Sequence, residues 1–177
     1  MTSPLAIWWI RRDLRLEDNA VLAAIRADGF TALPVFIVDP ILMDSGASSN
    51  IRKDFLLAAL DALRHRLHTH RTEIVIRYGK PWSELSKLMA ETGASKIYAE
   101  ADYSRFARDR DTNVSKHVPL QLVGEPTVAP LQNITKPDGN YYKIFSGYYR
   151  AWFSWVQQNA HTFPITGKLP DFHQITP

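Results

Sequence analysis

The strongest constraint in this sequence is a series of short apolar runs separated by segments long enough for a helix. Five such runs occur, each of four to six residues. They are Leu5 to Ile10, Leu33 to Val38, Glu73 to Tyr78, Lys96 to Ala99 and Leu120 to Val123. Strands that are apolar on both faces are typical of parallel sheets covered by helices. The spacing therefore predicts an α/β fold, a Rossmann-like three-layer wound sheet of five parallel strands with helices on both faces.

Five helices are predicted between these runs and after the last one. Their ranges are Asp18 to Ala27, Arg52 to Leu67, Trp82 to Glu91, Ser104 to His117 and Ser146 to Asn159. The second carries leucines at spacings of three and four, which form one stripe facing the sheet. Asp18 is the predicted cap of the first helix, and Ser48 to Asn50 offer capping oxygens for the second. Pro81 and Gly93 bracket the third helix in the favourable order.

The pattern changes after the fifth apolar run. Pro126, Pro130 and Pro137 interrupt any regular helix, so we expect an irregular arm with one turn before the last helix. The tail beyond that helix is proline-rich and polar, as linkers are. The predicted organisation is a wound domain over residues 1–130, an arm and terminal helix of the same domain over 131–160, and a linker over 161–177.

Composition narrows the possible chemistry. The chain has no cysteine, which excludes disulfides, thiolate catalysis, iron–sulfur clusters and cysteine zinc sites. His65 and His68 share a predicted exposed face, but no carboxylate joins them in a zinc motif, so no metal is predicted. A net charge of +3 is too small to indicate a nucleic-acid surface. The apolar stretch before Arg11 is too brief for a signal peptide or membrane span, so a cytoplasmic protein without membrane contact is expected.

A charged turn follows the first apolar run. From Trp8 to Asn19 the sequence reads Trp-Trp-Ile-Arg-Arg-Asp-Leu-Arg-Leu-Glu-Asp-Asn. In wound sheets ligands bind at the carboxyl ends of the strands, so this turn is a candidate binding element. The same residues could instead form a turn tied by Arg–Asp pairs, because surface charges are commonly just solvated. Spacing alone leaves both interpretations open.

The residues of this turn resemble the opening signature of the DNA photolyase and cryptochrome family, an aromatic-rich strand followed by Arg-Arg-Asp-Leu-Arg and Asp-Asn. Tyr142 to Trp152 is similar to the family motif Tyr-Lys-Val-Phe-Thr-Pro-aromatic-aromatic-Arg-x-Trp, with Ser146-Gly147 in place of Thr-Pro. Val35 to Pro40 resembles the family's second strand, and Tyr103 to Asp109 resembles its helix after the fourth strand. The resemblance extends from Leu5 to about Trp155.

The resemblance implies the N-terminal antenna domain of such a protein. Family members continue for more than twice this length into a helical domain that binds FAD and DNA, so we expect a chain truncated before that domain. Repair in the family transfers an electron from light-excited FAD to a pyrimidine dimer, and both lie in the helical part. The fragment alone is therefore expected to be inactive, with no catalytic residue and little DNA binding. At most it would hold an antenna chromophore: methenyltetrahydrofolate, a deazaflavin or FMN.

For members with a deazaflavin or FMN antenna, the resemblance places the chromophore at the carboxyl ends of the strands, whereas folate-binding members use a shallower groove between the two domains. The residues it assigns to the site at the strand ends are Arg11, Phe36, Asp39, Arg52 and Asp102. Arginine can pair with a phosphate or carbonyl, phenylalanine can stack on a ring, and aspartate can accept hydrogen bonds from ring or ribitol donors. Each position also has a purely structural alternative: a turn for Asp39, core for Phe36, surface for Arg52 and a helix start for Asp102.

Other functions remain open at the level of sequence. The same domain could belong to a cryptochrome that signals in blue light, or to a small nucleotide-binding Rossmann-like protein, although neither glycine-rich phosphate motif is present. A nonenzymatic interaction module is suggested by the aromatic last helix. Its aromatic residues are Tyr148, Tyr149, Trp152, Phe153 and Trp155. We expect part of this helix to dock against the missing domain and, without it, to favour self-association.

Overall fold

The sheet is the centre of the molecule. The computed structural model describes residues 3–44, 50–159 and 167–174. Its strands are β1 (Leu5–Ile10), β2 (Thr31–Val38), β3 (Val75–Tyr78), β4 (Lys96–Glu100) and β5 (Leu120–Val123). They form one sheet in the order β3-β2-β1-β4-β5, and every pairing is parallel. The predicted five-stranded wound sheet is confirmed, and the order changes direction at β1, between β2 and β4.

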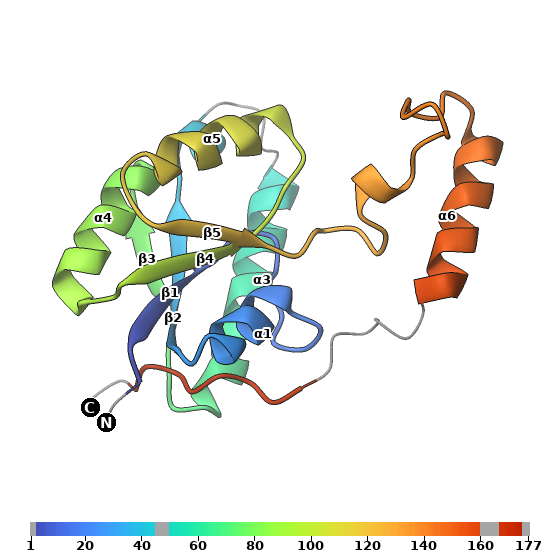
Figure 1. Cartoon of the computed structure of the whole chain (residues 1–177). Coiled ribbons are helices and arrows are strands. Elements are labelled where there is room, and N and C mark those ends of the chain that lie inside the picture. Colours follow the sequence, from blue (N-terminus) through green and yellow to red (C-terminus); the bar gives the residue numbers. More distant parts are fainter. Residues whose placement is uncertain (1–2, 45–49, 160–166, 175–177) are drawn as a thin grey trace.

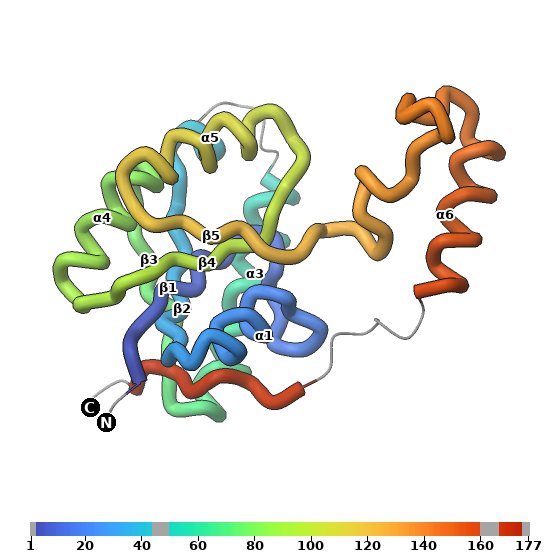
Figure 2. The backbone as a smooth tube through the Cα atoms, in the orientation of Figure 1, coloured from blue at the N-terminus to red at the C-terminus, as the bar shows by residue number. Residues whose placement is uncertain are grey.

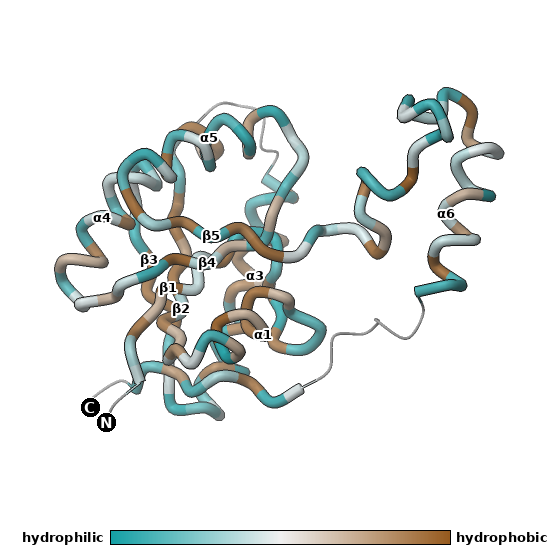
Figure 3. The backbone as a smooth tube through the Cα atoms, viewed as in Figure 1, coloured by the Kyte–Doolittle hydropathy of each residue, from teal (hydrophilic) through white to brown (hydrophobic). Residues whose placement is uncertain are grey.

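Helices cover both faces of the sheet (Figure 1). They are α1 (Ala20–Ala27), α2 (Pro40–Asp44), α3 (Asn50–His68), α4 (Pro81–Thr92), α5 (Arg105–Ser115) and α6 (Phe145–Asn159), with a short 3-10 turn at Leu131–Asn133. The strands and α1 are mostly brown, whereas hydrophobic and hydrophilic residues alternate along α3, α4 and α5 (Figure 3). Of these helices, only the short α2 has no counterpart among the predicted segments.

Two hydrophobic cores lie on opposite faces of the sheet, because side chains alternate along a strand. Trp8 and Ile10 of β1 pack in the core beneath α1 and α3. Ile7 and Trp9 pack in the other core, which contains residues of α4 and α5. All four side chains are at most 2% exposed. The central strand is therefore buried from both sides, which accounts for its unbroken apolar sequence.

The capping residues explain where the first helices begin. Asn19 caps α1: its side-chain oxygen accepts hydrogen bonds from the backbone N–H groups of Val21 and Leu22, at 2.9 and 3.1 Å. The predicted cap, Asp18, is wrong by one residue, and its backbone has a φ of 48° just before the helix. The capping oxygens predicted for α3 at Ser48 and Ser49 lie outside the described residues.

The first half of β2 is covered by the tail of the chain. Ala32 N–H donates to the Asp171 carbonyl (2.8 Å), and His173 N–H donates to the Ala32 carbonyl (2.9 Å). Phe172, between those two tail residues, is only 5% exposed and joins the core beneath α1. Figure 2 shows this red segment crossing below α1 toward the start of β2. The segment predicted to be a linker thus contains a docked stretch over residues 167–174.

The arm leads from β5 to α6 and carries that helix to one side of the sandwich (Figure 1). The described arm is irregular, as expected, but contains two turns rather than one: the 3-10 turn, and a turn at 136–139 in which Gly139 N–H donates to the Lys136 carbonyl (2.9 Å). No residue of α6 is buried. Its Phe145, Tyr149 and Phe153 form an exposed row, with ring centres 5.9 and 5.8 Å apart. The aromatic helix therefore lacks the close packing that the helices over the sheet have.

Candidate functional site

Arg11 follows the last residue of β1 and is built into the fold. Its Nη1 donates to Asp111 Oδ1 of α5 at 2.6 Å, and its Nη2 donates to the backbone carbonyl of Glu100 at the end of β4. The guanidinium also lies 4.9 Å from the centre of the Trp9 ring. Burial and the charge of Arg110 lower the pKa of Arg11, and the hydrogen bond to Asp111 opposes them. The side chain, 8% exposed, ties β1 to β4 and α5.

Phe36 and Arg52 lie in very different surroundings. Phe36, near the end of β2, is 7% exposed and belongs to the core beneath α1 and α3. Arg52 is exposed in the first turn of α3. The structure therefore does not bring these two side chains to one described cavity, and their chromophore roles remain predictions.

The two predicted acids each lie just before a helix: Asp39 directly precedes α2, and Asp102 lies two residues before Ser104, the N-cap of α5. Asp39 Oδ1 accepts a hydrogen bond from Ile41 N–H (3.0 Å) at the start of α2, where an aspartate followed by proline is a favourable start. Asp102 Oδ1 accepts from Ser104 N–H (2.9 Å), and its Oδ2 lies 3.6 Å from Arg12 Nη1. Burial raises the pKa of Asp102, but the bond to Ser104 and the Arg12 charge outweigh it and leave the pKa lowered.

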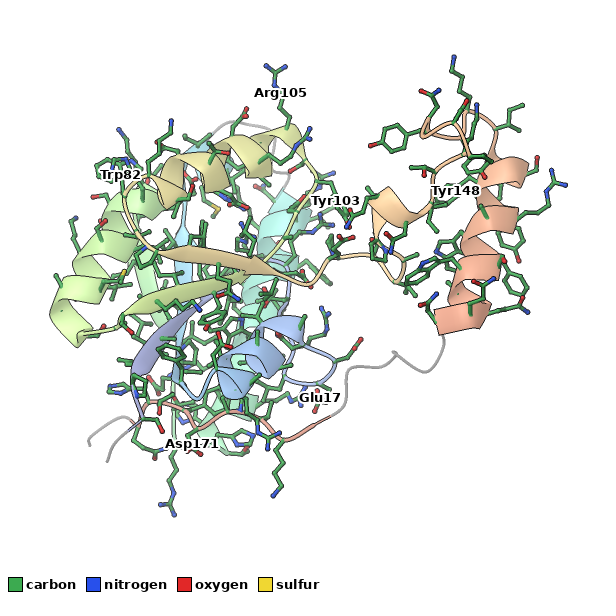
Figure 4. The ribbon with its side chains drawn as sticks, viewed as in Figure 1. Glu17, Trp82, Tyr103, Arg105, Tyr148 and Asp171 are labelled. Atoms are coloured by element: carbon green, nitrogen blue, oxygen red, sulfur yellow. The ribbon has the colours of Figure 1, made fainter. Side chains whose placement is uncertain are left out.

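Asp39 also lines a cavity of about 380 Å³ at the carboxyl end of β2, which we call the Asp39 cavity. Its other walls come from α2, the start of α4 and one face of α5. The side chains that give it chemical character are Lys80, Trp82, Phe106, Asp109 and Arg110. Trp82 lies at the start of α4 beside α5 (Figure 4), and its ring stacks on His117 with 4.5 Å between centres. The cavity thus combines aromatic walls with charges of both signs.

Arg110 is the most unusual of these side chains. Its guanidinium lies 5.0 Å from the Trp9 ring centre and 5.9 Å from that of Phe106. Nε donates to Asp111 Oδ1 at 2.9 Å, and Nη2 forms an ion pair with the same oxygen, also at 2.9 Å. The buried Nη2 makes no well-aligned hydrogen bond among the described residues, so an acceptor on a bound molecule would add one.

Sequence reasoning identified one of the residues around this cavity, Asp39, and missed the rest. The available signal was the spacing of Phe106, Arg110 and Asn113, which places them on one face of a predicted helix. The sequence could not show that this face of α5 lines a cavity, because the rotation of the helix about its axis depends on which apolar residues it packs against the sheet. Ala107 and Val114 are the ones that pack inward.

The sheet order and a cavity at the carboxyl edge define a doubly wound α/β domain of the kind that binds ligands there. The family model for DNA photolyase matches residues 6–166 of this chain. The chain therefore belongs to the DNA photolyase family. This result favours the resemblance over the alternative of an unrelated nucleotide-binding protein.

Individual relatives agree with this assignment. A deoxyribodipyrimidine photo-lyase of Streptomyces griseus is 29% identical to this chain, over 94% of the chain and 38% of its own length. One from Synechococcus sp. (strain ATCC 27144) is 28% identical over 86% of the chain and 32% of its own length. Cryptochrome-2 of Gallus gallus is also 28% identical, over 76% of the chain. The chain thus spans about a third of the length of the photo-lyases it matches.

Solved structures show the same fold. A class III photolyase from Agrobacterium tumefaciens superposes with a TM-score of 0.77 at 19% identity, covering 99% of this chain and 36% of that protein. An archaeal photolyase from Sulfolobus tokodaii, described with two FAD molecules, superposes with a TM-score of 0.72 at 21% identity, covering 96% of this chain and 37% of that protein.

Among the helices described here, none is long and apolar enough to cross a membrane.

Proposed function

We propose that this chain is the light-harvesting domain of a deoxyribodipyrimidine photo-lyase and that a planar chromophore occupies the Asp39 cavity. The single observation that carries the proposal is the placement of that cavity. It lies at the carboxyl edge of a photolyase-family sheet and is lined by aromatic rings, two acids and two bases. Pockets of about 300–1,000 Å³ lined in this way are the usual size for small-molecule sites.

The side chains present fit a flavin-like ring. Trp82 and Phe106 offer apolar faces. The Arg110 guanidinium, paired with Asp111, has a buried Nη2 without a well-aligned hydrogen bond in the described chain, which suits a ring carbonyl or phosphate. Asp39 and Asp109 can accept hydrogen bonds from ring or ribitol donors. A bound deazaflavin, FMN or folate would absorb near-ultraviolet or blue light. The work of the protein there is to hold the ring and exclude water.

The remaining parts of the repair activity are proposed for regions that this chain does not span. The matched photo-lyases are much longer than the chain, which covers 38% and 32% of two of them. We propose that FAD and pyrimidine-dimer DNA bind outside this domain and that the chain alone harvests light without repairing DNA. Within the family, a cryptochrome signalling role is separated from this one by assaying repair with the complete gene product.

Chromophore binding tests the proposal. The 177-residue chain is titrated with FMN, a deazaflavin and methenyltetrahydrofolate in separate experiments, and binding is followed by the fluorescence of each compound. We expect saturable one-to-one binding of one of them. Arg110→Met should weaken it about tenfold, the effect of one charge-assisted hydrogen bond. Trp82→Ala should weaken it by a similar factor.

A matched control lies on the same helix. Arg108 is exposed on α5 and does not line the Asp39 cavity, so Arg108→Met should leave chromophore affinity unchanged. Equal losses for Arg108→Met and Arg110→Met would mean that binding depends on net charge rather than on the cavity. Failure of all three compounds to bind would contradict the proposal.

The exposed aromatic row on α6 is the proposed site of self-association. Phe145 is 75% exposed, Tyr149 46% and Phe153 43%. An apolar row of this kind favours association in water. We expect Tyr149→Lys to shift the chain toward monomer in sedimentation velocity, while Arg150→Lys, on the same helix, does not. A chain that is monomeric before either change would contradict the proposal.

A further inference from the structure

A second cavity, of about 500 Å³, opens at the carboxyl ends of β4 and β5. We call it the Glu100 cavity. It is enclosed by the turn after β1, the start of α1, the ends of both strands, the arm and α6. The side chains that matter for its chemistry are Arg15, Asp18, Glu100, Glu125, Val128 and Trp155. It shares no lining residue with the Asp39 cavity.

Acidic side chains outnumber basic ones in this cavity. Among the residues that line it, three are acids and only Arg15 is basic. Glu125 is already engaged: its carboxylate accepts hydrogen bonds from the Tyr103 hydroxyl and from Gln132 Nε2, the latter at 3.0 Å. The excess of negative charge favours a cationic ligand over an anionic one.

Glu100 forms an ion pair with Arg15, but its carboxylate accepts no hydrogen bond from the described residues. The side chain is only 6% exposed. The nearest cation is Arg15, whose Nη2 lies 3.6 Å from Glu100 Oε1, too far for a hydrogen bond. Arg11 contacts only the backbone carbonyl of Glu100.

The charges that shift the pKa of Glu100 come from one segment, the turn after β1. Burial raises the pKa of Glu100, and the negative charge of Asp13 adds to that effect. Arg15, Arg11 and Arg12 act in the opposite direction without cancelling it. The carboxylate therefore pairs with Arg15 but has no hydrogen-bond donor among the described residues, and donors on a bound molecule would stabilise it.

We propose that the Glu100 cavity binds a planar nitrogenous cation of the guanidinium or amidinium class. Such a group presents two parallel N–H donors, which match the two oxygens of a carboxylate. Trp155 and the prolines of the arm supply apolar walls, and an indole face attracts a flat cation. The two sources of this chemistry are a small molecule and an arginine side chain. The inference is independent of chromophore binding in the Asp39 cavity.

Benzamidinium chloride is the probe that tests the proposal. It is titrated into the 177-residue chain, and the heat of binding is measured by calorimetry. We expect saturable one-to-one binding that is at least about tenfold tighter than that of benzamide, a neutral molecule of nearly the same shape. This contrast uses the unaltered protein, so it does not depend on whether a variant folds. Equal binding of the two compounds, or none of either, would overturn the proposal.

Variants then locate the site. Glu100→Gln should weaken benzamidinium binding about tenfold or more, because the amide loses the charge and one acceptor oxygen. Glu91→Gln is the matched control, since Glu91 pairs with Arg77 on the far side of the sheet from β5. The affinity should also fall as the pH is lowered through the raised pKa of Glu100, while benzamidinium stays charged. An unchanged affinity in Glu100→Gln would overturn the assignment.

Two further probes distinguish the sources. Agmatine presents a guanidinium on a free small molecule, and the tripeptide Gly-Arg-Gly presents it on a peptide backbone. Tighter binding of agmatine favours a small-molecule ligand, whereas tighter binding of the peptide favours an arginine side chain. Either result supports a planar-cation site. Failure of both probes to compete with benzamidinium would count against such a site.

Discussion

The two cavities lie at the same edge of one sheet, yet their side chains suit different ligands. The Asp39 cavity has aromatic walls with two acids and two bases, which suits a neutral or weakly charged ring. The Glu100 cavity has three acids and one base, which suits a cation. The fold provides the edge, and the side chains at each strand end determine the chemistry, as is general for wound sheets.

The two cavities also differ in what encloses them. All walls of the Asp39 cavity belong to the sheet sandwich, whereas the Glu100 cavity needs the arm and Trp155 of α6. Between them lies Arg11, after the central strand β1, which binds both Asp111 and the Glu100 carbonyl. Asp111 is next to Arg110, which lines the Asp39 cavity, and Glu100 lines the other cavity. Through these two contacts, Arg11 supports the walls of both cavities. Variants that act on one cavity and spare the other therefore test the comparison directly.

The largest effect on stability is expected from Arg11, because it supports the walls of both cavities. Arg11→Met should lower the free energy of unfolding by about 3–5 kcal/mol, since it leaves the buried Asp111 carboxylate without that partner. The double variant Arg11→Met with Asp111→Leu should recover part of this loss. Urea unfolding followed by circular dichroism measures both. A loss below about 1 kcal/mol would show that Arg11 is free to serve a ligand, as the family resemblance implied.

A comparison of two phenylalanines separates packing from ligand binding. Phe36→Ala should cost about 3 kcal/mol of stability, because Phe36 is 7% exposed within the core. Phe106 is 39% exposed in the wall of the Asp39 cavity, so Phe106→Ala should cost less than about 1 kcal/mol but weaken chromophore binding. Thermal unfolding and chromophore titration of each variant give the two numbers. If Phe36→Ala instead weakened chromophore binding and Phe106→Ala mainly lowered stability, the stacking role predicted for Phe36 would be supported.

The strands could be predicted from the sequence, but the surroundings of Phe36 and Arg110 could not. The apolar runs predicted all five strands. The central strand β1 is covered on both faces and is apolar throughout, whereas the edge strands β3 and β5 are only partly buried but still form short apolar runs. Phe36 and Arg110 could not be assigned in the same way, because what a side chain faces depends on the packing of segments distant in sequence. The docked tail is a similar case: its polar, proline-rich sequence indicates a linker, yet Phe172 is buried in the core and Leu169 packs against it.

Glu100 gives a pH-dependent prediction that concerns one cavity only. The pKa of Glu100 is raised in the folded chain, so protonated Glu100 stabilises the fold. This contribution to the free energy of unfolding is complete at pH values below the pKa that Glu100 has in the unfolded chain. That contribution is lost as the pH rises through the folded pKa. Glu100→Gln should therefore stabilise the chain at neutral pH by about 1 kcal/mol, the cost of a buried acceptor without a hydrogen bond. Urea unfolding at several pH values should show this gain disappearing in acid, and a gain that persists there would contradict the assignment.

The smallest effect is expected from Tyr103, which ties the arm to the loop after β4. Its hydroxyl donates to Glu125 and lies 3.2 Å from Thr127 Oγ1, and Figure 4 shows it between the sandwich and the arm. Tyr103→Phe should cost about 0.5 kcal/mol and increase amide hydrogen exchange in the arm, with the exposed Tyr141→Phe as control. Benzamidinium binding should weaken about twofold, while chromophore binding in the Asp39 cavity stays unchanged. Equal losses at both cavities would mean that they act as one unit, because the arm touches only the Glu100 cavity.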